Sequence, residues 1–444
     1  MKNKTPILFI IVGLSALLLG ILFGLLASLQ YILPDFLKTY IPFTKMRPFH
    51  VTTVISWIVL SATGSIYFFI IHIEKMRLYS VKLSKLHFGI FIITAIGIYV
   101  SFLSGKMEGR EYLAYTPILT IPILFGWILF SINYFKTVRE NVQKLPVYFW
   151  MWGTGIVFMI YHLSEAHFWL IPSFREHFIR DISVQWKSYG SFVGSWNMLV
   201  YGTAIYLMSK VKKDSNLAHG KITFFFYFLG LTNLMFGWAH HTYIIPTQPW
   251  IRYVAYAISM TEWIVLAHII YSWMRSLSNK NKEDYCMVYK FLKAADFWVF
   301  INIIIALLFS IPTINFFTHG THVTVAHSMG TTIGINTTIL FAAVFFIVQK
   351  LLPNATIDFL FIKRSYYFFN GSLLLFFCTL LYAGIKRSNW MYFTKDVPFS
   401  EMQNGLHTTY IVFFIFGISL AISITLIAFT LIKALIKTLK ITKK

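Results

Sequence analysis

The sequence is poor in cysteine and in charged residues, and each shortage excludes a class of protein. Its two cysteines, Cys286 and Cys378, are far apart in the chain, so no disulfide framework is expected. No C-x-x-C-H motif occurs, which excludes a covalently attached c-type haem on this chain. Only 12% of the residues are charged, which argues against a soluble domain.

Apolar residues are abundant instead. Of the 444 residues, 57% are hydrophobic, and the mean hydropathy is +0.67. Twelve apolar runs of about 20 residues or more are long enough to cross a bilayer as helices. They lie near 7–31, 49–73, 86–104, 115–135, 146–171, 186–208, 221–243, 253–276, 293–315, 320–350, 364–386 and 407–435. Because the loops between them are short, we expect an all-α, polytopic membrane protein with a single membrane-embedded domain over residues 1–444.

The net charge of +22 follows membrane topology rather than a nucleic-acid surface. When the loops are assigned alternately to two sides, 26 of the 38 Lys and Arg residues fall on the side of the N-terminus and 12 on the other. Basic residues accumulate on the cytoplasmic side of membrane proteins, so both termini are predicted to be cytoplasmic. Anionic lipid is their expected neighbour, and no nucleic-acid partner is predicted.

Several histidines lie within the apolar runs, where ionisable groups are costly and commonly functional. With alternating topology, His50, Tyr189, the pair His240–His241 and His327 all lie near the outer ends of their helices. Scattered core histidines would have no reason to share one depth. A neutral imidazole is the commonest protein ligand of transition metals and haem iron. The shared depth therefore predicts a metal or haem layer near the outer face.

His327 and Met329 are two residues apart on one predicted helix. At about 100° per residue, they project from nearly opposite faces of that helix. One helix would then carry ligands for two haems, one on each side.

Four segments together resemble a known family. They are Arg47-Pro-Phe-His50, Glu108-Gly-Arg110-Glu111-Tyr112-Leu113, Ala239-His240-His241-Thr-Tyr243 and Phe317-Thr-His319-Gly-Thr-His322-Val-Thr-Val-Ala-His327-Ser-Met329-Gly330. In order, spacing and depth they resemble the ligand segments of the large, catalytic subunit of bacterial nitric oxide reductases, within the haem–copper oxidase superfamily. Twelve spans is the number of this family, so the resemblance covers nearly the whole chain.

The resemblance implies two haems of b type. His50 and Met329 would be the axial ligands of a low-spin haem b, with methionine where the family usually has histidine. Methionine sulfur is a competent haem ligand and raises the reduction potential. His327 would be the proximal ligand of a high-spin haem b. Arg110 would neutralise haem propionates, and His319 would lie near them.

The resemblance also implies a second metal, a non-haem iron or copper. His240 and His241 would hold it, with Tyr189 as a further ligand. Glu111 would bind a calcium ion through oxygen. Glu262 matches a membrane glutamate near the reductase active site and would be a proton donor.

The sixth run departs from the family pattern. A gap-free alignment places Tyr189 at the third histidine ligand of the second metal, Val193 at its glutamate ligand and Asn197 at a second glutamate. Valine cannot bind a metal, so two histidines alone would hold the second metal weakly. Glu165 and His167 are candidate substitutes, but their spacing of two on a helix lets at most one of them reach the site.

The residues and the resemblance together predict a nitric oxide reductase-like enzyme, in which two NO, two electrons and two protons give N₂O and water. One alternative is a haem electron-transfer or NO-sensing subunit with a degenerate second-metal site. Another is a divergent terminal oxygen reductase. The last is disfavoured, because the two places where oxygen reductases carry a cross-linked tyrosine hold Val193 and Leu234.

The expected setting is the inner membrane of a bacterium, with a small gaseous substrate, NO or O₂. Since this chain has no c-haem motif, the expected electron donor is a separate, membrane-anchored cytochrome c subunit. A membrane quinol is the alternative donor.

Overall fold

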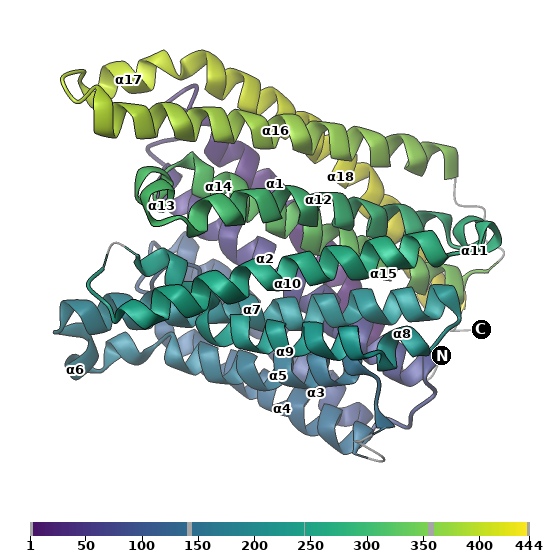
Figure 1. Cartoon of the computed structure of the whole chain (residues 1–444). Coiled ribbons are helices and arrows are strands. Elements are labelled where there is room, and N and C mark those ends of the chain that lie inside the picture. Colours follow the sequence, from purple (N-terminus) through teal and green to yellow (C-terminus); the bar gives the residue numbers. More distant parts are fainter. Residues whose placement is uncertain (1–2, 140–143, 244, 354–358, 442–444) are drawn as a thin grey trace.

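The computed structural model describes residues 3–139, 144–243, 245–353 and 359–441, and every named element in these ranges is helical. The long helices lie side by side along one direction and form a bundle (Figure 1). Within the described ranges, the only β-type pairing is an isolated bridge between Arg110 and Leu113. The prediction of an all-α fold is confirmed.

The bundle consists of long helices joined by short helical segments. The long helices are α1 (Thr5–Leu29), α2 (Phe43–Phe68), α3 (Val81–Leu103), α4 (Thr120–Val138), α5 (Val147–Glu165), α7 (Phe178–Lys212), α9 (Lys221–Phe236), α10 (Pro249–Ser276), α12 (Cys286–Ser310), α15 (Thr338–Leu351), α16 (Phe359–Phe393) and α18 (His407–Ile441). The shorter ones are η1 (Phe69–Ile73), η2 (Pro117–Leu119), η4 (Phe168–Leu170), α6 (Pro172–Arg175), α8 (Asn216–His219), η5 (Gly237–Thr242), α11 (Asn279–Asp284), α13 (Pro312–Thr318), α14 (His322–Met329), η6 (Gly330–Thr337) and α17 (Phe399–Gly405). Proline occupies one of the first two positions of α1, α6, α10 and α13, where its missing N–H breaks no helical hydrogen bond.

Both ends of the chain lie at the same end of the bundle (Figure 1). The ammonium group of Lys4 donates a hydrogen bond to the carbonyl of Leu439 at 3.0 Å, so the start of the chain and the last helix meet. We call the opposite end of the bundle the distal end. The end that holds both termini is called the terminal end. Because α1 starts there, α2 starts at the distal end, and successive long helices run in alternating directions.

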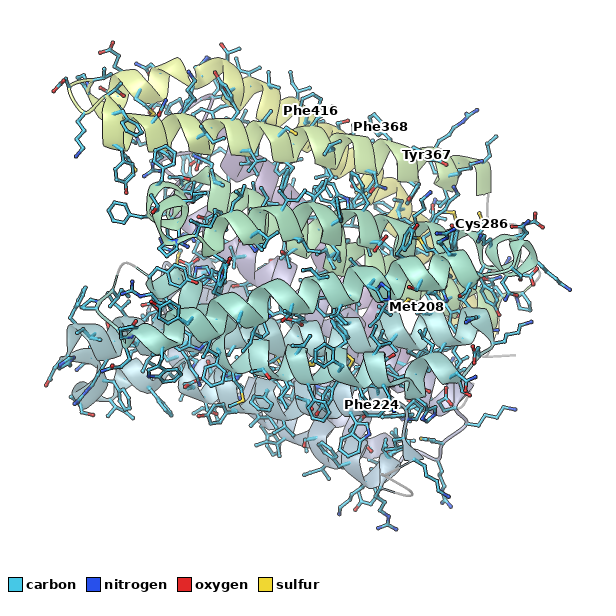
Figure 2. The ribbon with its side chains drawn as sticks, in the orientation of Figure 1. Met208, Phe224, Cys286, Tyr367, Phe368 and Phe416 are labelled. Atoms are coloured by element: carbon cyan, nitrogen blue, oxygen red, sulfur yellow. The ribbon has the colours of Figure 1, made fainter. Side chains whose placement is uncertain are left out.

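Nine helices in the described part of the chain are long and apolar enough to cross a membrane. The protein is therefore a multi-pass membrane protein. Three more of the expected spans coincide with α5, α7 and α10, which lie in the same bundle but do not meet the criterion of length and apolar composition. Large apolar side chains face outward, among them Tyr367 and Phe368 on the flank of α16 (Figure 2), as expected for contact with lipid.

Both cysteines are free thiols, as predicted. Cys286 begins α12 at the terminal end of the bundle (Figure 2). Cys378 lies within α16 and is exposed.

The span His322–Leu351, formed by α14, η6 and α15, is the most deeply buried of the nine. From Ile339 to Val348 its side chains are all apolar and all buried, so this part of the bundle interior is filled by hydrocarbon and aromatic side chains. Most polar side chains of the same span lie in its distal part, on α14 and η6, apart from Thr338, Gln349 and Lys350 on α15. This distribution places the candidate site in the distal half of the bundle.

Candidate metal and haem site

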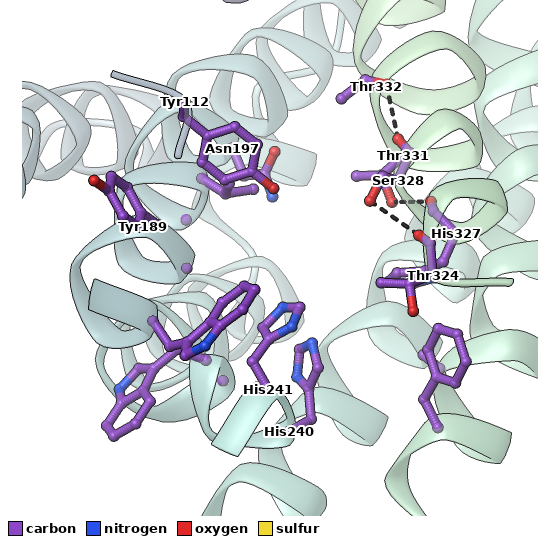
Figure 3. A pocket seen from close by; sticks show the side chains of 18 of the residues that line it. Tyr112, Tyr189, Asn197, His240, His241, Thr324, His327, Ser328, Thr331 and Thr332 are labelled. Carbon is purple, nitrogen blue, oxygen red and sulfur yellow. Dashed lines mark hydrogen bonds between the residues drawn. The ribbon is translucent and has the colours of Figure 1, made fainter. Parts of the chain in front are cut away.

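A cavity of about 260 Å³ opens in the distal half of the bundle, between α2, α7, η5, α12, α14 and η6 (Figure 3). We call it the histidine cavity. Seven of the site residues predicted from sequence line it: His50, Tyr189, His240, His241, His319, His327 and Met329. The structure thus brings residues from four separate segments of the chain to one internal space.

His50 is fixed by the helix behind it. Its Nδ1 atom lies 2.7 Å from the carbonyl oxygen of Gly20 on α1, a distance at which the ring N–H donates to that carbonyl. A Cβ atom on Gly24 would come within 2.8 Å of the same Nδ1, so glycine is required there for the ring to fit. With Nδ1 engaged, Nε2 is the nitrogen left for a ligand. Histidines that bind metals commonly have this arrangement, and it fits an axial ligand.

His240 and His241 lie in η5, a tight turn at the distal end of α9. Their ring centroids are 4.1 Å apart, and the ring of His241 stacks on the indole of Trp186 at 4.8 Å and 8°. The side-chain amide of Asn315 donates to the carbonyl of His240 at 3.0 Å and to that of Phe309 at 2.9 Å, which ties η5 to the end of α12. Nδ1 of His241 is buried and has no hydrogen-bond partner among the described residues. An imidazole nitrogen in that state fits a metal ligand.

His327 and Met329 lie at the end of α14, where the chain passes into the π-helix η6. Both line the histidine cavity, and the ring of His327 packs edge-on against Phe309 at 5.6 Å. The hydroxyl of Thr331 donates to the carbonyl of His327 at 3.1 Å. Figure 3 shows Ser328 and Thr331 on the side of this helix that faces α7. π-helical turns are rare and occur frequently at functional sites.

The part of α7 that lines the cavity does not present the further metal ligands that a complete second-metal site would need. Tyr189 lines the cavity with its ring, but its hydroxyl points away from His240 and His241 in Figure 3. Val193 lines the same wall and offers no ligand atom. Asn197 accepts a hydrogen bond from the Asn336 amide at 3.1 Å and so bridges α7 to η6. In this arrangement the Tyr189 hydroxyl does not face the two histidines, so its role as a third ligand stays a prediction.

The two suggested substitutes are held elsewhere. Glu165 forms an ion pair with Lys187 and lies 2.9 Å from Nδ1 of His162. The ring of His167 is engaged at both nitrogens, by the Thr120 hydroxyl at 2.9 Å and by the Leu163 carbonyl at 2.8 Å. Neither Glu165 nor His167 lines the histidine cavity.

Two imidazoles are therefore the protein ligands available to a second metal. Within the residues that the structure describes, no group of three or more His, Cys, Asp or Glu side chains converges as a metal site would need. The chemistry of His240 and His241 suits iron or copper, but the donor set is incomplete. The proposed haem ligands His50 and His327, by contrast, each line the cavity from a helix of their own, α2 and α14.

The residues predicted to lie over the haems occupy a separate, smaller space at the distal end. We call it the vestibule; its volume is about 220 Å³ and it is lined by Arg47, Arg110, Glu111, Tyr112 and neighbouring residues. Arg110 pairs with Asp181 at 2.7 Å. Arg110 does not line the histidine cavity, so its contact with propionates stays a prediction.

Glu111 is paired with an arginine in this structure, and its role as a calcium ligand stays a prediction. Its carboxylate forms an ion pair with the guanidinium of Arg47. Calcium takes six to eight oxygen ligands, and the described residues bring no carboxylate cluster to Glu111.

His319 and Glu262 occupy different positions relative to the cavity. His319 lies in the turn before α14, 5.8 Å from the ring of His241, and burial lowers the pKa of His319, which favours the neutral ring. Glu262 on α10 does not line the cavity. Its carboxylate accepts a hydrogen bond from the amide of Asn233, and Asn233 does line the cavity. One side chain thus separates Glu262 from the site.

Sequence reasoning missed Trp186, Asn315 and the cavity-facing position of Tyr112. Trp186 and Asn315 act through a ring stack and two backbone hydrogen bonds, for which a single sequence carries no signal. Tyr112 lies inside a segment already singled out, between Glu111 and Leu113. Its position at the cavity depends on a tight turn with positive φ at Tyr112, a conformation that tyrosine does not favour.

Comparisons with known proteins agree with this arrangement. Residues 4–419 match the family described as Cytochrome C and Quinol oxidase polypeptide I. The B subunit of the nitric oxide reductase of Stutzerimonas stutzeri is 23% identical over 331 residues, which cover 69% of this chain and 67% of that protein. A solved structure of a heme-copper terminal oxidase dimer superposes with a TM-score of 0.73 at 16% identity, over 97% of this chain and 83% of the other. At that identity the superposition shows a shared fold.

Proposed function

The chain belongs to the family of cytochrome c and quinol oxidase polypeptide I, within the haem–copper oxidases, and from this premise we propose that it is a nitric oxide reductase-like respiratory enzyme. The reaction is 2 NO + 2 e⁻ + 2 H⁺ giving N₂O and H₂O. The observation that carries the proposal is the histidine cavity, which collects His50, His240, His241, His327 and Met329. The likeness to a nitric oxide reductase in sequence supports this substrate over O₂.

Two haems would take ligands from α14, one through His327 and one through Met329. His50 and Met329 would bind a low-spin haem b, and His327 would bind a high-spin haem b. Bound there, the haems supply one-electron chemistry and a coordination site for a small gas. The chain's own part is to hold the His50 ring through Gly20 and to shape the cavity around two reactant molecules.

A second metal, non-haem iron or copper, would be held by His240 and His241. Trp186 and Asn315 orient these two rings by stacking and by fixing the backbone of η5. Tyr189 joins this set only if its hydroxyl turns towards the histidines. Proton delivery is assigned to Glu262, because the amide of Asn233 links its buried carboxylate to the cavity wall.

The same proposal covers the setting of the protein. Residues 1–444 form one domain with twelve transmembrane helices, α5, α7 and α10 included, in a bacterial inner membrane. The termini lie in the cytoplasm, so the distal end faces the periplasm. Electrons come from a membrane-anchored cytochrome c subunit, or from a quinol.

A second candidate function is a haem-bearing electron-transfer or NO-sensing subunit. The incomplete ligand set favours it, because Val193 offers no ligand atom and the Tyr189 hydroxyl points away. A divergent oxygen reductase is the third, consistent with the shared fold of the terminal oxidase.

The test is haem and metal content of the purified protein, followed by reduced-minus-oxidised and CO-difference spectra and by turnover under NO and under O₂. Two b-type haems, one of which binds CO, about one second metal per chain and N₂O production support the enzyme. Two haems without a second metal and without turnover support the electron-transfer or sensing subunit. Turnover of O₂ alone assigns the chain to oxygen reduction, and the absence of haem refutes all three.

A further inference from the structure

Three internal spaces of the distal half meet at one side chain, Tyr112. The histidine cavity and the vestibule are two of them. The third, which we call the apolar cavity, has a volume of about 220 Å³ and lies between α1, α2, α3, α4, α5 and α7. Tyr112 is the one residue that lines all three, and Ile55 is the only other residue shared by the apolar cavity and the histidine cavity within the described chain.

The apolar cavity has the chemistry of a site for small uncharged molecules. Among the described residues, no charged side chain lines it. The hydroxyls of Ser15, Ser56 and Thr94 donate to carbonyls of their own helices at 2.7–3.0 Å. The hydroxyl of Thr52, a residue that also lines the vestibule, is buried and has no hydrogen-bond partner among the described residues. A cavity lined mainly by apolar side chains accepts small apolar ligands.

The vestibule has the opposite chemistry. Arg47, Arg110 and Glu111 line it, and it shares Val51 and Tyr112 with the histidine cavity. Charged walls favour water and ions. Val51 and Tyr112 therefore lie between the charged wall of the vestibule and the buried imidazoles of the histidine cavity.

The backbone at Tyr112 is held in a conformation that tyrosine disfavours. Arg110 and Leu113 close a tight turn through a 3.0 Å backbone hydrogen bond, and Tyr112 occupies its third position with φ of +63°. Glycine or asparagine is the usual residue there, and a bulky side chain with positive φ is an outlier. The ion pairs Arg110–Asp181 and Arg47–Glu111 hold the turn from both sides. Such strain persists where the surrounding structure imposes it, commonly at functional sites.

The ring of Tyr112 is directed inward. It meets the ring of Tyr189 edge-on at 5.8 Å and 84°, and Figure 3 shows it projecting into the cavity. Burial and the neighbouring Glu111 carboxylate raise the pKa of Tyr112 to about 12, so the phenol is uncharged at neutral pH. An uncharged aromatic ring thus lies where the three spaces meet.

We infer that Tyr112 determines which molecules enter the histidine cavity: it admits small uncharged molecules from the apolar cavity and excludes ions from the vestibule. The inference rests on the proposed function in so far as it names the class of substrate, an uncharged apolar gas. The barrier itself is a property of the chain's own side chains.

Accessibility of a thiol inside the histidine cavity tests this role. In a chain carrying Cys286→Ser, Cys378→Ser and Ser328→Cys, the probes are charged sulfonatoethyl methanethiosulfonate and uncharged methyl methanethiosulfonate. We expect the uncharged reagent to label Ser328→Cys at least about tenfold faster than the charged one. Tyr112→Gly, which suits the positive φ, should speed charged labelling about tenfold. Tyr112→Phe keeps the ring and should leave both rates unchanged.

Tyr115→Phe is the matched control, because Tyr115 belongs to the same loop but lines only the apolar cavity. The inference is overturned if both reagents label the parent equally fast, or if Tyr112→Gly leaves the ratio of rates unchanged. Haem content is measured on the same preparation. A chain without haem refutes the proposed function, while the labelling ratio still decides the role of Tyr112.

Discussion

At the scale of single residues, the role proposed for His50 depends on the close packing of its ring against α1. The Gly20 carbonyl fixes Nδ1, and the absent side chain of Gly24 makes space for the same atom. Two positions on one helix therefore decide the orientation of a ring on the next. This is the contact between proposed ligand and scaffold that the structure defines most sharply.

The variant Gly24→Ala should displace the His50 ring, because the new Cβ would lie 2.8 Å from Nδ1 and 2.9 Å from Cε1. We expect retention of the low-spin haem to weaken by about tenfold or more, as for changes in residues that orient a ligand. Haem titration and the low-spin absorption bands measure this. Gly371→Ala on α16 is the control, since a Cβ there meets nothing within 4 Å. Unchanged low-spin bands in Gly24→Ala would remove His50 from the ligand set.

At the scale of elements, the pair His240–His241 depends on the junction between η5 and the end of α12. Asn315 makes that junction with two N–H donors from one amide group. The amide therefore sets the distance between the backbone of the histidine turn and the helix end beside it. A second metal held by only two imidazoles is especially sensitive to their position.

Asn315→Asp keeps the size of the side chain and removes both donors, leaving a carboxylate facing two carbonyl oxygens. We expect second-metal affinity to fall by about 10- to 100-fold, with haem content unchanged. Metal retained after dialysis against a graded chelator measures it. Asn370→Asp on α16 is a control, because the amide N–H of that asparagine donates to its own helix, at the Tyr366 carbonyl. Equal retention by Asn315→Asp and the parent would contradict the proposed junction.

At the scale of the whole molecule, the structure places both termini at one end, and the basic residues identify which side of the membrane that end occupies. A fluorescent protein fused after Lys444 should therefore fluoresce, and alkaline phosphatase fused there should be inactive. Phosphatase fused after Asp396, in the loop between α16 and α17, should be active. An active phosphatase after Lys444 would reverse the proposed orientation.

Sequence alone predicted the helical class, the positions of the long helices and seven of the residues that line the histidine cavity. Apolar runs locate a helix well but not its ends: the run near 186–208 belongs to α7, Phe178–Lys212, whose polar distal turns carry no hydropathy signal. The prediction that His50 and His327 lie in one layer held, because the depth of a residue in the membrane follows from its position along a transmembrane helix. The direction of the Tyr189 side chain and the ion-pair partner of Glu111 could not be predicted from sequence. Both depend on residues from distant segments of the chain.

The π-helix η6 has a consequence for how this chain tolerates change in length. A π-helix takes more residues per turn than an α-helix, so Gly330–Thr337 sets the angular phase between α14 and α15. Deleting one residue within this stretch would rotate His327 and Met329 by about 100° relative to α15. We therefore expect substitutions on either side to be tolerated more readily than an insertion or a deletion within the stretch. The number of residues in this stretch is thus as much a part of the site as the ligands themselves.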